Sequence, residues 1–133
     1  MPRHTDVLAG SLAAALTVTG TLHFARPRAF DALIPPALGS PRAWVYGSGV
    51  AELACAAAVA VPATRRVGGL ATAALFVAVF PGNVKMALDS HPGARSWARK
   101  PSVAWGRLPL QVPLVAWAWR VARTAPSVSA RRT

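Results

Sequence analysis

Acidic residues are scarce in this sequence. Only four of its 133 residues are Asp or Glu, against 15 Lys and Arg, so the formal net charge is +11. A soluble domain usually has about a quarter of its residues charged, with both signs mixed over the surface. Here only 14% are charged, which is unlike an ordinary soluble domain.

Cysteine is nearly absent as well, since Cys55 is the only one. An internal disulfide or a dithiol relay needs two thiols, so neither can form within one chain. Cys55 lies in an apolar stretch, where a small buried packing residue is the simplest interpretation. The histidines, His4, His23 and His91, are scattered along the chain, and the sequence predicts no metal site.

Long apolar runs fill the stretches that lack charge. Hydrophobic residues make up 53% of the chain, and the basic residues gather near its ends and in "TRR" (64–66) and "RSWARK" (95–100). Nucleic acid binding requires basic side chains on one face with aromatic or polar residues between them. Basic residues that flank apolar runs are instead typical of membrane proteins. The pattern predicts the lipid bilayer, and no nucleic acid, as a partner.

The apolar runs predict an all-α fold, an integral membrane four-helix bundle with short loops, as a single transmembrane domain over 1–133. We expect helices at about 7–25, 44–62, 67–88 and 102–122, because about 20 apolar residues cross a hydrocarbon core of about 30 Å. The fourth segment contains Arg107, Pro109 and Pro113, so it should kink, and a re-entrant segment is the alternative. "RAFDALI" (28–34) is amphipathic enough to lie along the interface. Residues 123–133 are expected to be a disordered basic tail.

The first apolar segment has the basic-then-apolar order of a signal peptide. It is followed by "TLHFARP" (21–27), which lacks a small-x-small cleavage site, so we expect a retained helix, with cleavage as the alternative. Four spans put both termini on one side of the membrane. The basic residues divide almost equally between the two sides, but the short "TRR" turn favours a multi-pass protein of the cell membrane with cytoplasmic termini.

A few polar residues interrupt the apolar segments. Because successive helices run in opposite directions, these residues fall in one leaflet, on the side of the connections 26–42 and 90–102. An ionisable group there costs about 2.5 to 3.5 kcal/mol, so it should face the bundle interior and find a partner. We therefore expect a polar, ligand-binding cavity formed by His23, Ser48, Glu52, Asn83, Arg107 and Gln111.

Within that set, spacing indicates partners. Ser48 and Glu52 are four residues apart, as are Arg107 and Gln111, so each pair shares a helix face. We expect Glu52 to be ionised opposite Arg107, with its hydrogen bonds completed by neutral amides, and His23 to line the cavity mouth. In the structural alternative the charged pair only fixes helix register, and His23 is an interfacial residue. Lys85 is expected to reach the headgroups.

Several motifs together resemble one family. "LHF" (22–24), "IPP" (34–36), "SGVAEL" (48–53), "VFPGNVKMAL" (79–88) and "RLPLQ" (107–111) are similar in content and order to the small DoxX-like membrane proteins. The resemblance implies a four-helix membrane protein, in a family whose name comes from subunits linked to quinone and sulfur-compound oxidation. It implies no catalytic residue. The lack of a cysteine pair argues against a thiol-disulfide mechanism.

Two functions stay open. The first is a component of a quinone-linked membrane oxidoreductase system, in which the polar cavity receives a quinone or another small amphiphile and the partners are oxidoreductase subunits. The second is a non-catalytic membrane partner or structural subunit, in which the same residues only fix helix packing. A quinone, haem or flavin spectrum of the purified protein would discriminate between them.

Overall fold

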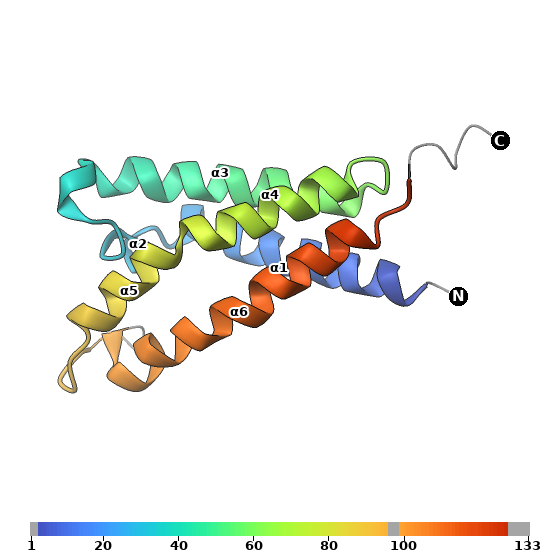
Figure 1. Ribbon diagram of the computed structural model, residues 1–133. Helices are drawn as coiled ribbons and strands as arrows, with labels where there is room; N and C mark the ends of the chain where they lie inside the picture. Colours follow the sequence, from blue (N-terminus) through green and yellow to red (C-terminus); the bar gives the residue numbers. More distant parts are fainter. Residues whose placement is uncertain (1–2, 96–98, 128–133) are drawn as a thin grey trace.

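Long helices make up most of the protein. The computed structural model describes residues 3–95 and 99–127, and no β-strand occurs in these ranges. The long elements are α1 (His4–Ala25), α3 (Pro41–Ala60), α4 (Arg65–Ala78), α5 (Phe80–Asp89) and α6 (Pro101–Arg123). The start of α1, the α3–α4 turn and the end of α6 lie at one end of the molecule, which we call the terminal end (Figure 1). The predicted all-α class is confirmed.

Helix α1 packs against α3, and α4 packs against both α3 and α6. Helix α5 continues the direction of α4 and lies beside α6 at the other end of the molecule, which we call the loop end (Figure 1). The predicted segments 7–25, 44–62 and 102–122 correspond to α1, α3 and α6. The segment predicted at 67–88 corresponds to two helices, α4 and α5.

The division between α4 and α5 follows from one proline. Pro81 has no backbone N–H, so it cannot donate to the carbonyl of Val77, and its ring crowds that carbonyl. The regular helix therefore stops at Ala78 and starts again at Phe80, with Pro81 in the first turn of α5. Proline is well tolerated in a first turn because the N–H there has no intrahelical acceptor. Helix α6, by contrast, continues as one element across Pro109 and Pro113.

The connection between α1 and α3 is held against the bundle by side chains. It contains the short helix α2 (Arg28–Asp31) and the 3₁₀ helix η1 (Pro36–Leu38). The Arg42 guanidinium donates to Asp31 at 2.9 Å, and the Trp44 indole donates to the Leu38 carbonyl at 2.9 Å. Lys85 donates to the carbonyl of Ala32 at 3.0 Å and to the Asp89 carboxylate. The ammonium of Lys85, which was expected to reach the headgroups, therefore joins α5 to this connection.

Glycines allow the helices to approach closely. A Cβ added at Gly49 of α3 would lie 2.9 Å from the His23 Cβ of α1, and one at Gly68 of α4 would lie 2.7 Å from the Val59 nitrogen of α3. One at Gly69 would lie 2.8 Å from the Ala122 nitrogen of α6. Close backbone approach at small residues is typical of helix pairs in membranes.

Apolar side chains both fill the interior of the bundle and cover much of its outer surface. Small and medium residues fill the interior near the terminal end, among them Leu12, Leu16, Val59 and Val121. Large apolar side chains face outward on every long helical segment; Val18, Val50, Val67 and Val112 are between 60% and 73% exposed. A protein in water avoids extended apolar surfaces of this kind.

Within the described residues, three helical stretches are long and apolar enough to cross a membrane by length and composition. They are His4–Ala25, Pro41–Ala60 and the combined stretch Arg65–Asp89. Helix α6 has the length of a span but carries Arg107, Arg120 and Arg123, and it is not among the three. The apolar stretches are compatible with a membrane protein.

Candidate functional site

The acid of α3 meets the histidine of α1. The Nδ1 atom of His23 lies 3.2 Å from Oε2 of Glu52, and the two side chains are only 11% and 14% exposed. The contact forms where α1 and α3 approach at Gly20 and Gly49. A larger residue at either glycine would meet a side chain of the facing helix at 2.9 Å or less. The glycines therefore place the His23–Glu52 pair.

Local contacts orient the His23 ring. Nδ1 lies 2.7 Å from the carbonyl oxygen of Thr19, one turn earlier in α1. Since a carbonyl oxygen only accepts, Nδ1 carries a proton and donates it. The ring also stacks on Phe30 with centroids 4.0 Å apart. In the neutral ring, Nε2 is then the acceptor nitrogen.

Glu52 is left with an unsatisfied atom. Its Oε2 is buried and has no hydrogen-bond partner among the described residues, because Nδ1 of His23, although near, directs its hydrogen bond to Thr19. A buried polar atom without a partner costs about 1 to 3 kcal/mol, and more when it is charged. This carboxylate oxygen can accept a donor from a ligand, or hold a proton itself.

Asn83 and Gln111 form a second polar group, between α5 and α6. The Asn83 amide donates to Oε1 of Gln111 at 3.3 Å, and the Gln111 amide donates to the carbonyl of Phe76. Phe76 belongs to the last turn of α4, where carbonyls lack donors from the following turn. Gln111 therefore satisfies a carbonyl at the α4–α5 break and ties it to α6.

The expected pairing of Glu52 with Arg107 is wrong. Arg107 donates from Nη1 to the sulfur of Met86 at 3.6 Å. The ion pair of Glu52 is with His23, and none of the ion pairs within the described residues includes Arg107. Neither Asn83 nor Gln111 bonds to Glu52. Ser48 is half-buried on α3 and makes no side-chain hydrogen bond to another described residue. Of the six expected residues, His23 thus contacts Glu52 and Asn83 bonds to Gln111, while Ser48 and Arg107 form no hydrogen bond or ion pair with the other four in the described structure.

The physical reason lies in the packing of the helices. Helical spacing predicts the depth of each polar residue along its helix, but depth does not specify the facing helix. Helix α3 packs on α1 and α4, while α5 packs on α6. Glu52 therefore meets the polar residue of α1, and Asn83 meets that of α6.

One further polar site was not expected. Arg65, 7% exposed, donates from Nε to the carbonyl of Val59 at 2.9 Å, from Nη2 to that of Ala60 at 3.2 Å, and from Nη1 to Asp6 at 2.9 Å. It satisfies the last carbonyls of α3 and joins α1 to the α3–α4 turn. The available signal was the predicted topology of four spans, because it puts Asp6, just before the first apolar run, at the same end as the "TRR" turn.

A shallow apolar groove runs along α6. It has a volume of about 530 Å³, and it is lined by Phe80 of α5 and by Leu108, Gln111, Val112, Val115, Ala116 and Trp119 of α6. Gln111 is its polar member, and its amide is already bonded. The described residues contain no group of three or more His, Cys, Asp or Glu that could hold a metal ion.

Residues 12–122 match the model of a family described as a domain of unknown function, DUF8561. This range includes His23, Glu52 and the whole α5–α6 polar group. Neither the curated proteins nor the solved structures include a match to this chain.

Proposed function

We propose that this chain, which belongs to the DUF8561 family, is an integral protein of the cell membrane. It receives the headgroup of a quinone, or of a similar small amphiphile, at His23 and Glu52. Its four helical segments cross the bilayer, α6 being the fourth, and both termini are cytoplasmic. The resemblance of its motifs to DoxX-like proteins supports a role beside membrane oxidoreductase subunits.

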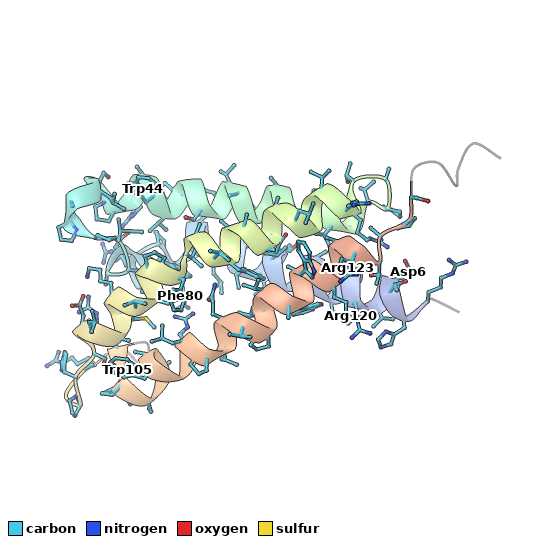
Figure 2. The ribbon with its side chains drawn as sticks, viewed as in Figure 1. Asp6, Trp44, Phe80, Trp105, Arg120 and Arg123 are labelled. Atoms are coloured by element: carbon cyan, nitrogen blue, oxygen red, sulfur yellow. The ribbon has the colours of Figure 1, made fainter. Side chains whose placement is uncertain are left out.

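The outward-facing side chains support a membrane location. Exposed valines on each long segment would disfavour a monomer in water but suit a hydrocarbon solvent. Trp44 and Trp105 lie at the loop end (Figure 2); each is about half exposed, at 48% and 51%. Indole rings prefer the boundary between hydrocarbon and water. Helix α6 packs along α4, and its polar Gln111 is buried and bonded to Phe76 of α4, so we expect the two helices to cross together.

One observation carries the ligand proposal: the buried Oε2 of Glu52, which lacks a hydrogen-bond donor. A hydroxyl of a quinol would donate to this oxygen, and a protonated Glu52 would donate to the carbonyl of a quinone. His23 is positioned to stabilise the carboxylate, because its imidazolium would place a positive charge 3.2 Å from Oε2.

The chemistry proposed for the pair is proton exchange. Glu52 takes or gives the proton of the headgroup, and His23, held by Thr19 and Phe30, favours the charged carboxylate when the imidazole is protonated. Oxidation of a quinol releases two electrons and two protons. In this proposal Glu52 takes one proton, the second leaves to the aqueous phase, and both electrons pass to an oxidising partner subunit.

Binding of a short-chain ubiquinone analogue to the full chain in nanodiscs tests this proposal. We expect saturable binding that weakens about tenfold in Glu52→Leu, where no carboxyl can exchange a hydrogen bond. Asp89→Asn is the matched control, because it also removes one acid but lies at the end of α5, in contact with Lys85. Absence of saturable binding, or equal weakening by both variants, would refute the quinone proposal.

A second function rests on a different observation. The Asn83–Gln111–Phe76 contacts use these amides to repair a helix break, which supports a non-catalytic structural subunit. In that function Gln111→Leu lowers stability in detergent, by about 1 to 3 kcal/mol for an orphaned buried carbonyl. The Gln111→Leu variant would also lose the partner proteins that co-purify with the wild-type chain, while the Glu52→Leu variant would keep them.

A further inference from the structure

The groove along α6 leads toward exposed arginines. On a helix, residues at spacings of three, four, seven and eight share one face. Leu108, Val112, Ala116 and Trp119 line the groove at such spacings. Arg120 follows Ala116 by four residues and Arg123 follows Trp119 by four, so this face of α6 ends in two arginines.

Among the described residues, these arginines have no oppositely charged partner. Arg120 and Arg123 are exposed, and the ion pairs found among the described residues do not include them. Asp6 lies at the same end (Figure 2), but its carboxylate is bonded to Arg65. The terminal end also carries Arg66 at the start of α4. It therefore has unneutralised positive charge.

The length of the groove along α6 matches the thickness of one leaflet. From Leu108 to Trp119 the helix rises about 16 Å at about 1.5 Å per residue, close to half of a hydrocarbon core of about 30 Å. Figure 2 places Phe80 on the side of the loop end, and Arg120 and Arg123 at the terminal end. In the proposed membrane placement, the groove would run from the bilayer interior toward the headgroups at the terminal end.

We infer that this surface binds an anionic phospholipid of the leaflet at the terminal end, with an acyl chain in the α6 groove and the phosphate at Arg120 and Arg123. An apolar groove facing hydrocarbon is filled by whatever lipid chain fits it, and fixed positive charges at its mouth select a negative headgroup. Trp119, 51% exposed, lines the groove one turn before Arg123, where the proposed placement would put its indole ring near the boundary between hydrocarbon and water. The inference rests on the membrane placement proposed above, but not on quinone binding.

Quenching of Trp119 fluorescence tests it. The full chain would be placed in nanodiscs that contain a minor fraction of phosphatidylglycerol with brominated acyl chains in phosphatidylcholine, and in discs where the brominated lipid is phosphatidylcholine at the same fraction. Comparison with Trp119→Phe isolates the signal of this residue. We expect bromine on phosphatidylglycerol to quench Trp119 several-fold more than bromine on phosphatidylcholine.

Two variants and one control separate the phosphate-binding part of the site from the acyl-chain groove. Arg120→Gln with Arg123→Gln should abolish the preference, because each basic residue near the surface contributes about fivefold to anionic lipid binding. Arg26→Gln with Arg28→Gln removes the same charge at the loop end and should preserve the preference. Ala116→Phe fills the groove without changing charge and should reduce quenching by both lipids.

Several outcomes would overturn the inference: no preference in the wild-type chain, equal loss in both arginine pairs, or unchanged quenching in Ala116→Phe. Competition by soluble glycerol phosphate at millimolar concentration would show a phosphate site without the acyl groove, and would also overturn it. Extraction of the wild-type chain from membranes by alkaline carbonate would instead refute the membrane placement, and so separates the two failures.

Discussion

His23 on α1 and Glu52 on α3 face each other where Gly20 and Gly49 let the two helices approach, with Nδ1 of His23 3.2 Å from Oε2 of Glu52. Gly49 makes the approach possible, because a Cβ there would lie 2.9 Å from the His23 Cβ. The polar pair and the glycine contact are therefore one structural unit. Disturbing either should affect the other.

The His23–Glu52 pair should show energetic coupling. We expect Glu52→Gln and His23→Gln to be non-additive by about 0.5 to 3 kcal/mol in unfolding from detergent, as is usual for residues in direct contact. Glu52→Gln with Arg107→Gln is the matched cycle and should be additive. Coupling of Glu52 to Arg107 instead of His23 would contradict the geometry.

Among the arginines of the terminal end, Arg65 should lower stability the most when it is substituted. Arg65→Gln removes charge-assisted hydrogen bonds to the α3 carbonyls and to Asp6. With each such bond contributing about 1.5 to 3 kcal/mol, we expect a loss of stability of at least about 2 kcal/mol. Arg66→Gln, at an exposed neighbour, is the control and should change stability by less than about 0.5 kcal/mol. Equal effects in chemical unfolding would show that Arg65 does not cap α3.

Asp6→Asn distinguishes the carbonyl contacts of Arg65 from its ion pair. The Asp6 side chain is 47% exposed, and an exposed pair contributes only about 0 to 1 kcal/mol. The loss should therefore be clearly smaller than that of Arg65→Gln. An equal or larger loss in the same unfolding measurement would place the stabilisation in the ion pair.

Glycine positions in the helices should divide into two classes. Gly69→Ala places a Cβ 2.8 Å from backbone atoms of Ala122, so α4 and α6 must separate and stability should fall by about 1 to 3 kcal/mol. Gly47→Ala and Gly106→Ala meet nothing within 4 Å, and alanine is the better helix former by about 0.5 to 1 kcal/mol. Thermal unfolding in one detergent should therefore show opposite signs. The same sign at all three sites would mean that the α4–α6 contact is looser than described.

Labelling of single cysteines checks the topology. In a Cys55→Ala background, Ser40→Cys and Ser90→Cys lie in the connections at the loop end, and Ser127→Cys follows α6 at the terminal end. A membrane-impermeant reagent added to intact cells should label the first two and leave the third unlabelled. Labelling of Ser127→Cys alone would reverse the proposed orientation, and labelling of all three would contradict a bundle that crosses the membrane four times.

The sequence by itself determined the helical class and the approximate positions of the long helices. Runs of Ala, Val and Leu bounded by Arg, Pro and Gly can satisfy their backbone in apolar surroundings only as helices or closed barrels, and these runs have helical length. It also indicated that Glu52 has a partner, because an isolated buried acid costs too much free energy to persist. The cause of the break at "FPGN" is also local, since Pro81 has no N–H, but the segment 67–88 was expected as one helix.

Only the tertiary structure decided which partner each polar residue meets. Depth along a helix follows from counting residues, but the choice between His23 and Arg107 for Glu52 depends on which helix packs on α3. That choice is set by close contacts such as Gly20 with Leu53 and Gly69 with Ala122, which involve residues far apart in the chain. Arg65 was missed for the same reason, since its acceptors come from two helices and its charge suggested only a flanking residue. Packing between helices, and not the composition of any one helix, positions the candidate site.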